Sequence, residues 1–256
     1  MKVRLDKLLV DRGLAGSRER AHALILAGKV LVDDQKLEKA GAQVAAECAI
    51  RLLGEDLKYV SRGGLKLECA LDHWNIAVMG KVCLDVGAST GGFTDCLLQC
   101  GAAQVIAVDT GYGQMDFRLR QDARVRLLEK TNARYLKRDA IGVPVDLIVM
   151  DVSFISATLV LPAAIGAAFP ELPKEFPDES EARPRRQIVV LVKPQFEAGR
   201  EHVGKGGIVR DEAAQSASVE KVRTALQSLG AVHTDSIESP ILGAEGNREF
   251  LLYGKF

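Results

Sequence analysis

The chain has 256 residues, of which 47% are hydrophobic and 27% charged, enough for one substantial core and a small extra module. Its 34 basic and 34 acidic residues cancel, so binding to nucleic acid has to come from local groups of cations. The longest apolar stretch, residues 159–169, is too short to span a bilayer, and the N-terminus lacks the apolar core of a signal peptide. We therefore expect a cytoplasmic protein without a membrane partner.

Residues 1–60 have the pattern of a small α+β module. Leu5, Leu8 and Leu9 precede Gly13, which predicts a short helix, and Ser17 is a suitable N-cap for a second helix over residues 18–27. The segment KVLVDDQ predicts a strand that enters a turn. The module and its border carry the cations Arg4, Lys7, Arg12, Arg18, Arg20, Lys29 and Arg62. On composition alone these cations form an ordinary solvated surface, and phosphate contacts are the alternative.

Residues 61–256 alternate strand-like apolar runs with segments of helical length. The runs are VCLD, QVIAVD, DLIVMD, QIVVLVK and EFLLYGKF. Continuous apolar runs indicate strands buried on both faces, so we expect a parallel sheet between two layers of helices, a doubly wound α/β domain. Residues 170–186 are rich in proline and charge and predict an exposed insertion.

The ends of the expected strands carry charges. Asp85, Asp109, Asp151 and Lys193 each follow an apolar run. In open parallel sheets ligands bind beyond the carboxyl ends of the strands, so charges of both signs at one rim predict a binding or catalytic site there.

The segment LDVGASTGGFTD predicts a cofactor loop at one of these strand ends. It lacks the G-x-G-x-x-G spacing of dinucleotide-binding loops, and the chain has no phosphate-binding P-loop. A tight turn at Gly87 and close packing at Gly91 and Gly92 suit S-adenosylmethionine, which needs backbone contacts but no phosphate cradle. The expected cofactor-binding residues in and around this loop are Asp85, Gly87, Ala88, Ser89, Thr90, Gly91, Gly92 and Asp151.

Three further residues have candidate roles near the cofactor. Asp109 is placed to accept hydrogen bonds from ribose hydroxyls. Asn132 is a candidate for contact with adenine, although an asparagine that only caps its own turn is equally consistent with the sequence. Phe154 either stacks on a base or fills the core. The five cysteines and four histidines have no metal-ligand spacing, so no metal is expected, and the oligomeric state stays open.

The motifs LDVGASTGGFTD, SRGGLKLE, MDVSFIS, LVKPQFE and GNREF resemble, in order and spacing, those of the TlyA family. This resemblance implies an N-terminal RNA-binding domain similar to that of ribosomal protein S4 over residues 1–60 and a Rossmann-like, FtsJ-type methyltransferase domain over residues 61–256. It implies 2′-O-methylation of ribosomal RNA, at cytidine, with ribosomal RNA or ribosomal subunits as partners. It also changes the interpretation of these cations of the N-terminal module and its border, which become RNA-binding candidates.

FtsJ-type enzymes use a Lys-Asp-Lys-Glu tetrad, and its members match Lys66, Asp151, Lys193 and Glu249. Glu245 is an alternative to Glu249, which we prefer because it directly precedes the apolar run FLLY. Lys193 is followed by Pro194, which ends the strand and would fix the direction of the ammonium group. We expect Lys193 to act as the base that accepts the proton of the ribose hydroxyl.

Two other classes of function remain open at this point. One is a non-catalytic RNA-binding or ribosome-assembly factor, which the matching tetrad disfavours. The other is a membrane-active hemolysin, a label often given to the family, for which the sequence has no spanning segment or basic amphipathic helix of the required length.

Overall fold

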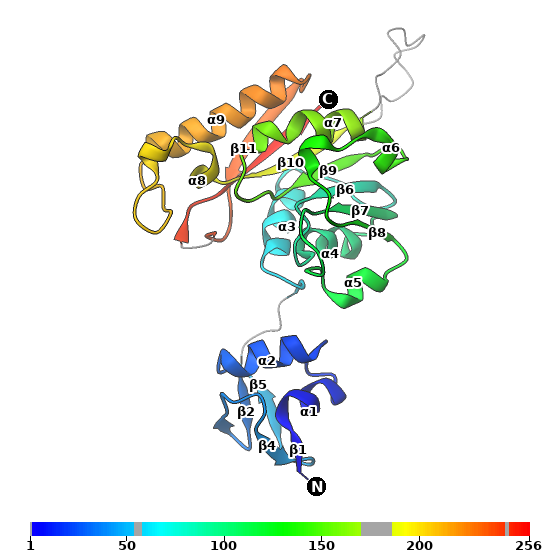
Figure 1. The fold of residues 1–256 in the computed structure, drawn as a ribbon, viewed down its shortest axis with the longest axis vertical. Coiled ribbons are helices and arrows are strands. Elements are labelled where there is room, and N and C mark those ends of the chain that lie inside the picture. The colour runs from blue at the N-terminus through cyan, green and yellow to red at the C-terminus, as the bar shows by residue number, and fades with distance from the viewer. Residues whose placement is uncertain (1, 54–57, 170–185, 244–245) are drawn as a thin grey trace. The chain divides into compact units, whose positions relative to one another are not determined.

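The computed structural model describes residues 2–53, 58–169, 186–243 and 246–256 (Figure 1). The chain divides into two compact units, residues 1–57 and 58–256, which are described separately. The boundary expected after residue 60 stays a prediction, and the expected insertion at 170–186 lies, apart from its last residue, outside the described residues.

The first unit has two helices and short antiparallel strands. The elements are β1 (Lys2–Arg4), α1 (Leu5–Asp11), α2 (Arg18–Leu26), β2 (Val30–Val32), β3 (Gln35–Lys36), β4 (Gln43–Ala45) and β5 (Ile50–Leu52). β1 pairs with β4, and β2 lies between β3 and β5. The Ser17 hydroxyl accepts a hydrogen bond from the Arg20 N–H at 3.1 Å, so it caps α2 as expected. Strands of three residues, such as β1, are too short for a periodic pattern in the sequence.

The second unit has a seven-stranded sheet in the order β11-β12-β10-β9-β6-β7-β8. Its strands are β6 (Val82–Val86), β7 (Gln104–Val108), β8 (Val125–Leu128), β9 (Leu147–Met150), β10 (Gln187–Val192), β11 (His233–Glu238) and β12 (Phe250–Lys255). Its helices are α3 (Gly63–His73), α4 (Gly92–Gln99), α5 (Phe117–Gln121), α6 (Arg138–Ile141), α7 (Leu161–Ala168), α8 (Pro194–Glu197) and α9 (Glu212–Ser228), with 3₁₀ turns η1 (Ala133–Tyr135), η2 (Ala157–Leu159) and η3 (Arg200–His202).

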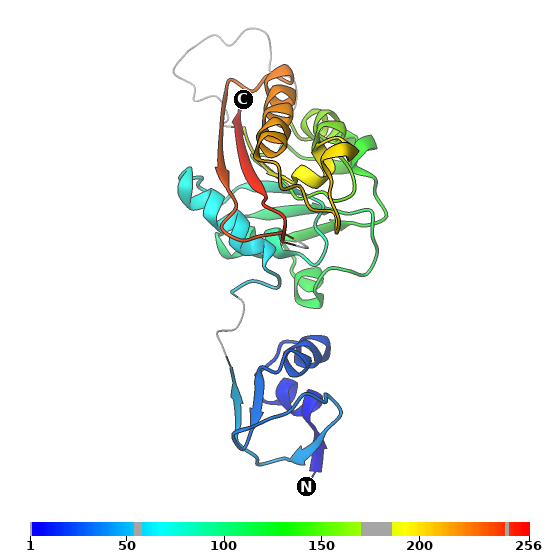
Figure 2. The ribbon, with the colours of Figure 1, turned by 90° about the vertical axis from the view of Figure 1, so that its left-hand side faces the viewer.

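The expectation of a wholly parallel sheet is wrong at one edge. β12 runs antiparallel to both β10 and β11 (Figure 2), whereas β10, β9, β6, β7 and β8 pair with one another in parallel. The apolar run FLLY indicates burial on both faces but carries no information on direction. β8 and β11 did not stand out in the sequence because charged and polar residues interrupt both strands.

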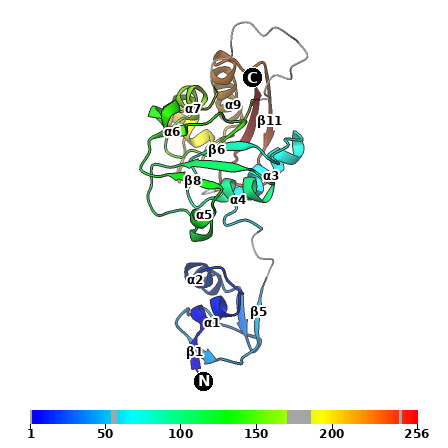
Figure 3. The ribbon, with the colours of Figure 1, turned by 90° about the vertical axis from the view of Figure 1, so that its right-hand side faces the viewer.

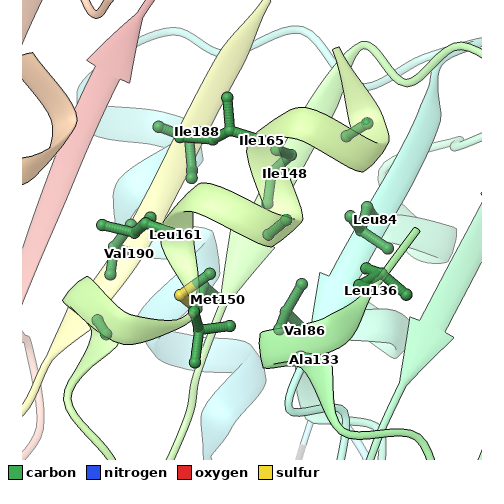
Figure 4. Packing of buried hydrophobic residues seen from close by; sticks show 14 of the residues in the cluster. Leu84, Val86, Ala133, Leu136, Ile148, Met150, Leu161, Ile165, Ile188 and Val190 are labelled. Carbon is green, nitrogen blue, oxygen red and sulfur yellow. The ribbon is translucent and has the colours of Figure 1, made fainter. Parts of the chain in front are cut away.

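Helices cover both faces of this sheet. Side chains from α6, α7 and α9 form one core with one face, and those from α3, α4 and α5 form a second core with the other (Figure 3). Alternate residues of each strand therefore enter different cores: Leu84 and Met150 face α7 (Figure 4), while Cys83 and Val149 face α3 and α4. This arrangement is the Rossmann-like fold expected from the sequence. No helix among the described residues is long and apolar enough to cross a membrane.

Candidate active site

The strand ends bring three of the four expected charges to one rim of the sheet. Asp109, Asp151 and Lys193 follow directly after β7, β9 and β10. Because these strands are parallel, their carboxyl ends lie at the same edge, and the side chains gather around the loop after β6.

Asp85 differs from this pattern, because it lies within β6 and is fully buried. Its Oδ2 accepts a hydrogen bond from the Thr94 hydroxyl of α4 at 2.6 Å, whereas Oδ1 has no hydrogen-bond partner. Burial, assisted by repulsion from Asp151 and Asp109, raises the pKa of Asp85 to about 7, against the opposing effect of the Thr94 bond. Asp85 is not among the residues that line the cavities described below, so the structure places it behind the loop, tied to α4.

The loop after β6 has a backbone that glycine makes possible. Gly87 has φ +88, and a Cβ there would lie 2.4 Å from the Asp151 carbonyl oxygen. Gly91, at φ +97, precedes α4, and a Cβ on Gly92 would lie 3.0 Å from the Gly64 backbone nitrogen. The glycines therefore let this loop approach both the segment after β9 and the start of α3.

Two cavities flank the loop and share Gly87, Ser89 and Asp151. The larger, about 530 Å³, extends toward Asp109, Gly111, Gln114, Thr131, Asn132 and Ile155. The smaller, about 240 Å³, is lined by Ser61, Arg62, Lys66, Ala88, Thr90 and Gly243, among others. An elongated ligand that passes over Gly87 would contact both cavities beside Asp151.

Lys193 and Asp151 form an ion pair at the rim. Lys193 Nζ lies 2.7 Å from Asp151 Oδ1 and donates a hydrogen bond of 2.7 Å to the Ser153 hydroxyl. Both charged side chains are mostly buried, at 11% and 22% exposed. Two neighbours thus fix the direction of the ammonium group, and the role of Ser153 had no signal in the sequence.

Lys66 and Glu249 form a second, more deeply buried ion pair. Lys66 Nζ contacts Glu249 Oε2, and the two side chains are 11% and 2% exposed. Gly243 leaves the space for this carboxylate, because a Cβ there would overlap Glu249. The structure thus brings the members of the proposed tetrad together as two pairs, with Lys66 and Asp151 on the wall of the smaller cavity. The alternative acid, Glu245, lies outside the described residues.

Asp109 and Asn132 both shape the larger cavity. Asp109 accepts hydrogen bonds from the backbone N–H groups of Ser89 at 2.7 Å and Gly111 at 2.6 Å, so it joins two loops. Asn132 accepts a hydrogen bond from the Arg134 N–H at 3.1 Å and so caps its own turn, as the alternative interpretation required, while it also lines the cavity.

Phe154 is 92% exposed, so the interpretation as core filler is wrong. Its backbone has φ +64, which is unfavourable for a bulky residue, and its ring lies 5.3 Å from that of Phe196. Stacking on a base stays a prediction.

Several expected RNA-binding cations have contacts within their own unit. Arg4 and Arg18 both bind the Asp6 carboxylate at 2.9 Å, and Arg12 donates to the carbonyl oxygens of Cys48 and Ala46. Lys7 and Lys29 are exposed, Arg20 is partly buried, and Arg62 lines the smaller cavity beside Lys66. A guanidinium group has five N–H donors, so these exposed arginines can still donate hydrogen bonds to phosphates beside the contacts within their own unit.

Comparison with known families agrees with the geometry. Residues 59–256 match the FtsJ-like methyltransferase family, and residues 3–47 match the S4 domain. The chain is 46% identical over 253 residues, 98% of its length and 89% of the relative's, to the 16S/23S rRNA (cytidine-2′-O)-methyltransferase TlyA of Mycobacterium tuberculosis. It is 39% identical to Hemolysin A of Brachyspira hyodysenteriae over 98% of this chain and 99% of that protein. A solved structure from Streptococcus thermophilus, described as a hemolysin, has 40% identity and a TM-score of 0.70 and covers 99% of this chain and 88% of that one.

The fold and the rim thus define an S-adenosylmethionine-dependent methyltransferase joined to an S4-type RNA-binding module. The chain belongs to the TlyA family of FtsJ-like methyltransferases.

The residues present fit the methyl donor. The larger cavity has polar groups suited to a nucleoside, and the smaller has the N-terminus of the eleven-residue helix α3 with Arg62, which suits the carboxylate of an amino acid. Gly87, which lines both cavities, lets the loop backbone lie close to the carbonyl oxygen of Asp151.

Proposed function

We propose that this protein methylates the 2′-hydroxyl of a ribose in ribosomal RNA, at cytidine, in the cytoplasm. The observation that carries the proposal is the ion pair between Lys193 and Asp151, because Asp151 lines both cavities. It is supported by the S4 domain and by the similarity to the 16S/23S rRNA (cytidine-2′-O)-methyltransferase of M. tuberculosis.

S-adenosylmethionine supplies an electrophilic methyl group on its sulfonium. Ser89, Asp109, Asn132 and the glycines of the loop would hold it, and Arg62 would bind either its carboxylate or a phosphate of the RNA. Asp85 would act from behind, because its bond to Thr94 fixes the start of α4 against the loop. Holding donor and acceptor in line removes the entropic cost of their encounter.

Lys193 would accept the proton of the 2′-hydroxyl at Nζ. Asp151 and Ser153 hold Nζ in place, and the Lys66–Glu249 pair keeps a second cation in the wall of the smaller cavity without adding net charge. To act as a base, Lys193 has to enter the reaction as the neutral amine, which takes up the proton that the 2′-hydroxyl loses.

In the first unit, Arg4, Lys7, Arg12, Arg18, Arg20 and Lys29 would contact phosphates and so supply affinity rather than sequence preference.

The test is transfer of labelled methyl groups from S-adenosylmethionine to ribosomal subunits and to ribosomal RNA, followed by mapping of 2′-O-methyl positions. We expect Lys193→Ala and Lys193→Arg to lose activity while they still bind the cofactor. Near wild-type activity of both variants would refute the role of Lys193. Equal methylation of an all-DNA copy of the target would refute the 2′-hydroxyl as acceptor.

A further inference from the structure

Glu197, the last residue of α8, is a buried carboxylate with no role in the reaction described above. Its side chain is 2% exposed. Oε2 accepts a hydrogen bond from the Ser156 hydroxyl at 2.5 Å, and Oε1 accepts one from the Ala157 N–H at 2.6 Å. Lys221 of α9 supplies the countercharge, with Nζ 3.2 Å from Oε2. Burying a carboxylate is unfavourable unless its partners are in place, so these contacts define one particular arrangement.

Glu197 connects two segments of the active site. Its partners Ser156 and Ala157 lie on the segment after β9, which carries Asp151, and Glu197 itself lies on α8, which follows Lys193. Ser156 follows Asp151 and Ser153 on the segment after β9, while Lys193 is the N-cap of α8, the helix that Glu197 completes. Ser156 lies three positions after Ser153, and Glu197 lies four positions after Lys193. The Glu197 contacts and the Lys193 contacts therefore join the same two segments at neighbouring points.

The segment after β9 has a conformation that needs such support. Phe154 adopts the left-handed region at φ +64 although it is bulky and exposed. A strained residue persists only where its surroundings fix the backbone on both sides. The side toward β9 is fixed by the sheet, and the other side is fixed by the bond between the Ala157 N–H and Glu197.

We infer that Glu197 is a positioning residue, which ties the segment after β9 to α8 and so keeps Lys193 in register with Asp151 and Ser153. Without this tie the two segments can separate, and Nζ loses the contacts that direct it toward the acceptor. The inference rests on the proposed function.

The experiment measures the single-turnover rate of methyl transfer with saturating cofactor and RNA, well below the unfolding temperature. We expect Glu197→Ala to lower this rate about tenfold or more, because small misplacements of reacting groups are costly, while cofactor affinity changes less than about twofold. Glu197→Gln should recover part of the rate, because its amide oxygen can accept the bond from Ala157 and its amide nitrogen can donate to Ser156, while the ion pair with Lys221 is lost. Glu220→Ala, which removes an exposed glutamate that contacts Arg223 on α9, is the matched control and should retain the wild-type rate.

A double-variant cycle separates positioning from a loss of stability. If Glu197 acts on Lys193 through the register with Ser153, the Glu197→Ala and Ser153→Ala effects overlap, and the double variant is less impaired than the product of the two single effects. Should Glu197→Ala fail to fold, Ser156→Ala removes one bond of the same tie and should slow transfer several-fold. A wild-type rate in Glu197→Ala, a failure of Glu197→Gln to recover activity, or multiplicative effects would overturn the inference. Absence of methyl transfer by the wild-type protein would instead contradict the proposed function.

Discussion

The buried carboxyl group of Asp85 predicts a specific dependence of stability on pH. Its pKa is raised to about 7 in the folded protein from an ordinary value of 3.8, chiefly by burial. Above pH 3.8 the unfolded chain ionises while the folded protein keeps the proton, so the unfolding free energy falls as pH rises and becomes level again above pH 7. Between pH 5 and pH 8 the loss from this group is about 3 kcal/mol, at 1.36 kcal/mol for each unit of pKa difference.

The assay is urea unfolding of the cofactor-free protein at pH 5, 6, 7 and 8, for the wild type and Asp85→Asn. The amide oxygen can still accept the bond from Thr94, but the side chain no longer titrates. We expect the difference in unfolding free energy between the two proteins to change by about 3 kcal/mol across this range, in favour of the variant at high pH. The other ionisable groups are the same in both proteins, so their contributions cancel in the difference. A constant difference from pH 5 to pH 8 would refute the assignment of a shifted pKa to Asp85.

Two further predictions concern the cofactor loop and the N-terminal unit. Gly87→Ala should lower the affinity for S-adenosylhomocysteine at least tenfold in calorimetry, because the new Cβ would lie 2.4 Å from the Asp151 carbonyl oxygen. Gly80→Ala is the control. Gly80 also has a positive φ, +74, but nothing lies within 4 Å of a Cβ there, so this variant should bind normally. Equal affinity in both variants would contradict the steric argument. Asp6→Ala should destabilise the first unit by about 1–3 kcal/mol in hydrogen exchange of α1, since it removes four hydrogen bonds to a buried carboxylate. Glu38→Ala, which breaks an exposed pair with Lys36, should have little effect. The hydrogen bond from Arg4 holds the pKa of Asp6 well below its usual range, so the Asp6 contribution should be complete above pH 4 and be lost as pH falls below it.

The sequence predicted the parts of the site that depend on chain order. The apolar runs located β6, β7, β9 and β10, and the residue after each run indicated Asp109, Asp151 and Lys193, because parallel strands share an edge. The same rule was wrong for Asp85. The strand continues for one residue beyond it, so Asp85 faces α4 inside the second core and not the rim.

Partners that are distant in the chain could not be predicted from the sequence. Lys66 and Glu249 are separated by 183 positions; the resemblance to the family named both, but no pattern in the sequence indicates that they pair. For Glu197 there was no indication at all, because a glutamate at the end of a short helix is usually solvated. The Glu197 side chain is buried because α9 packs over α8, and α9 also supplies Lys221. A carboxylate so placed costs stability unless it is fully bonded. The residues that bond it are those that follow Asp151 and Ser153, which is why the Glu197→Gln recovery is the most informative comparison at this site.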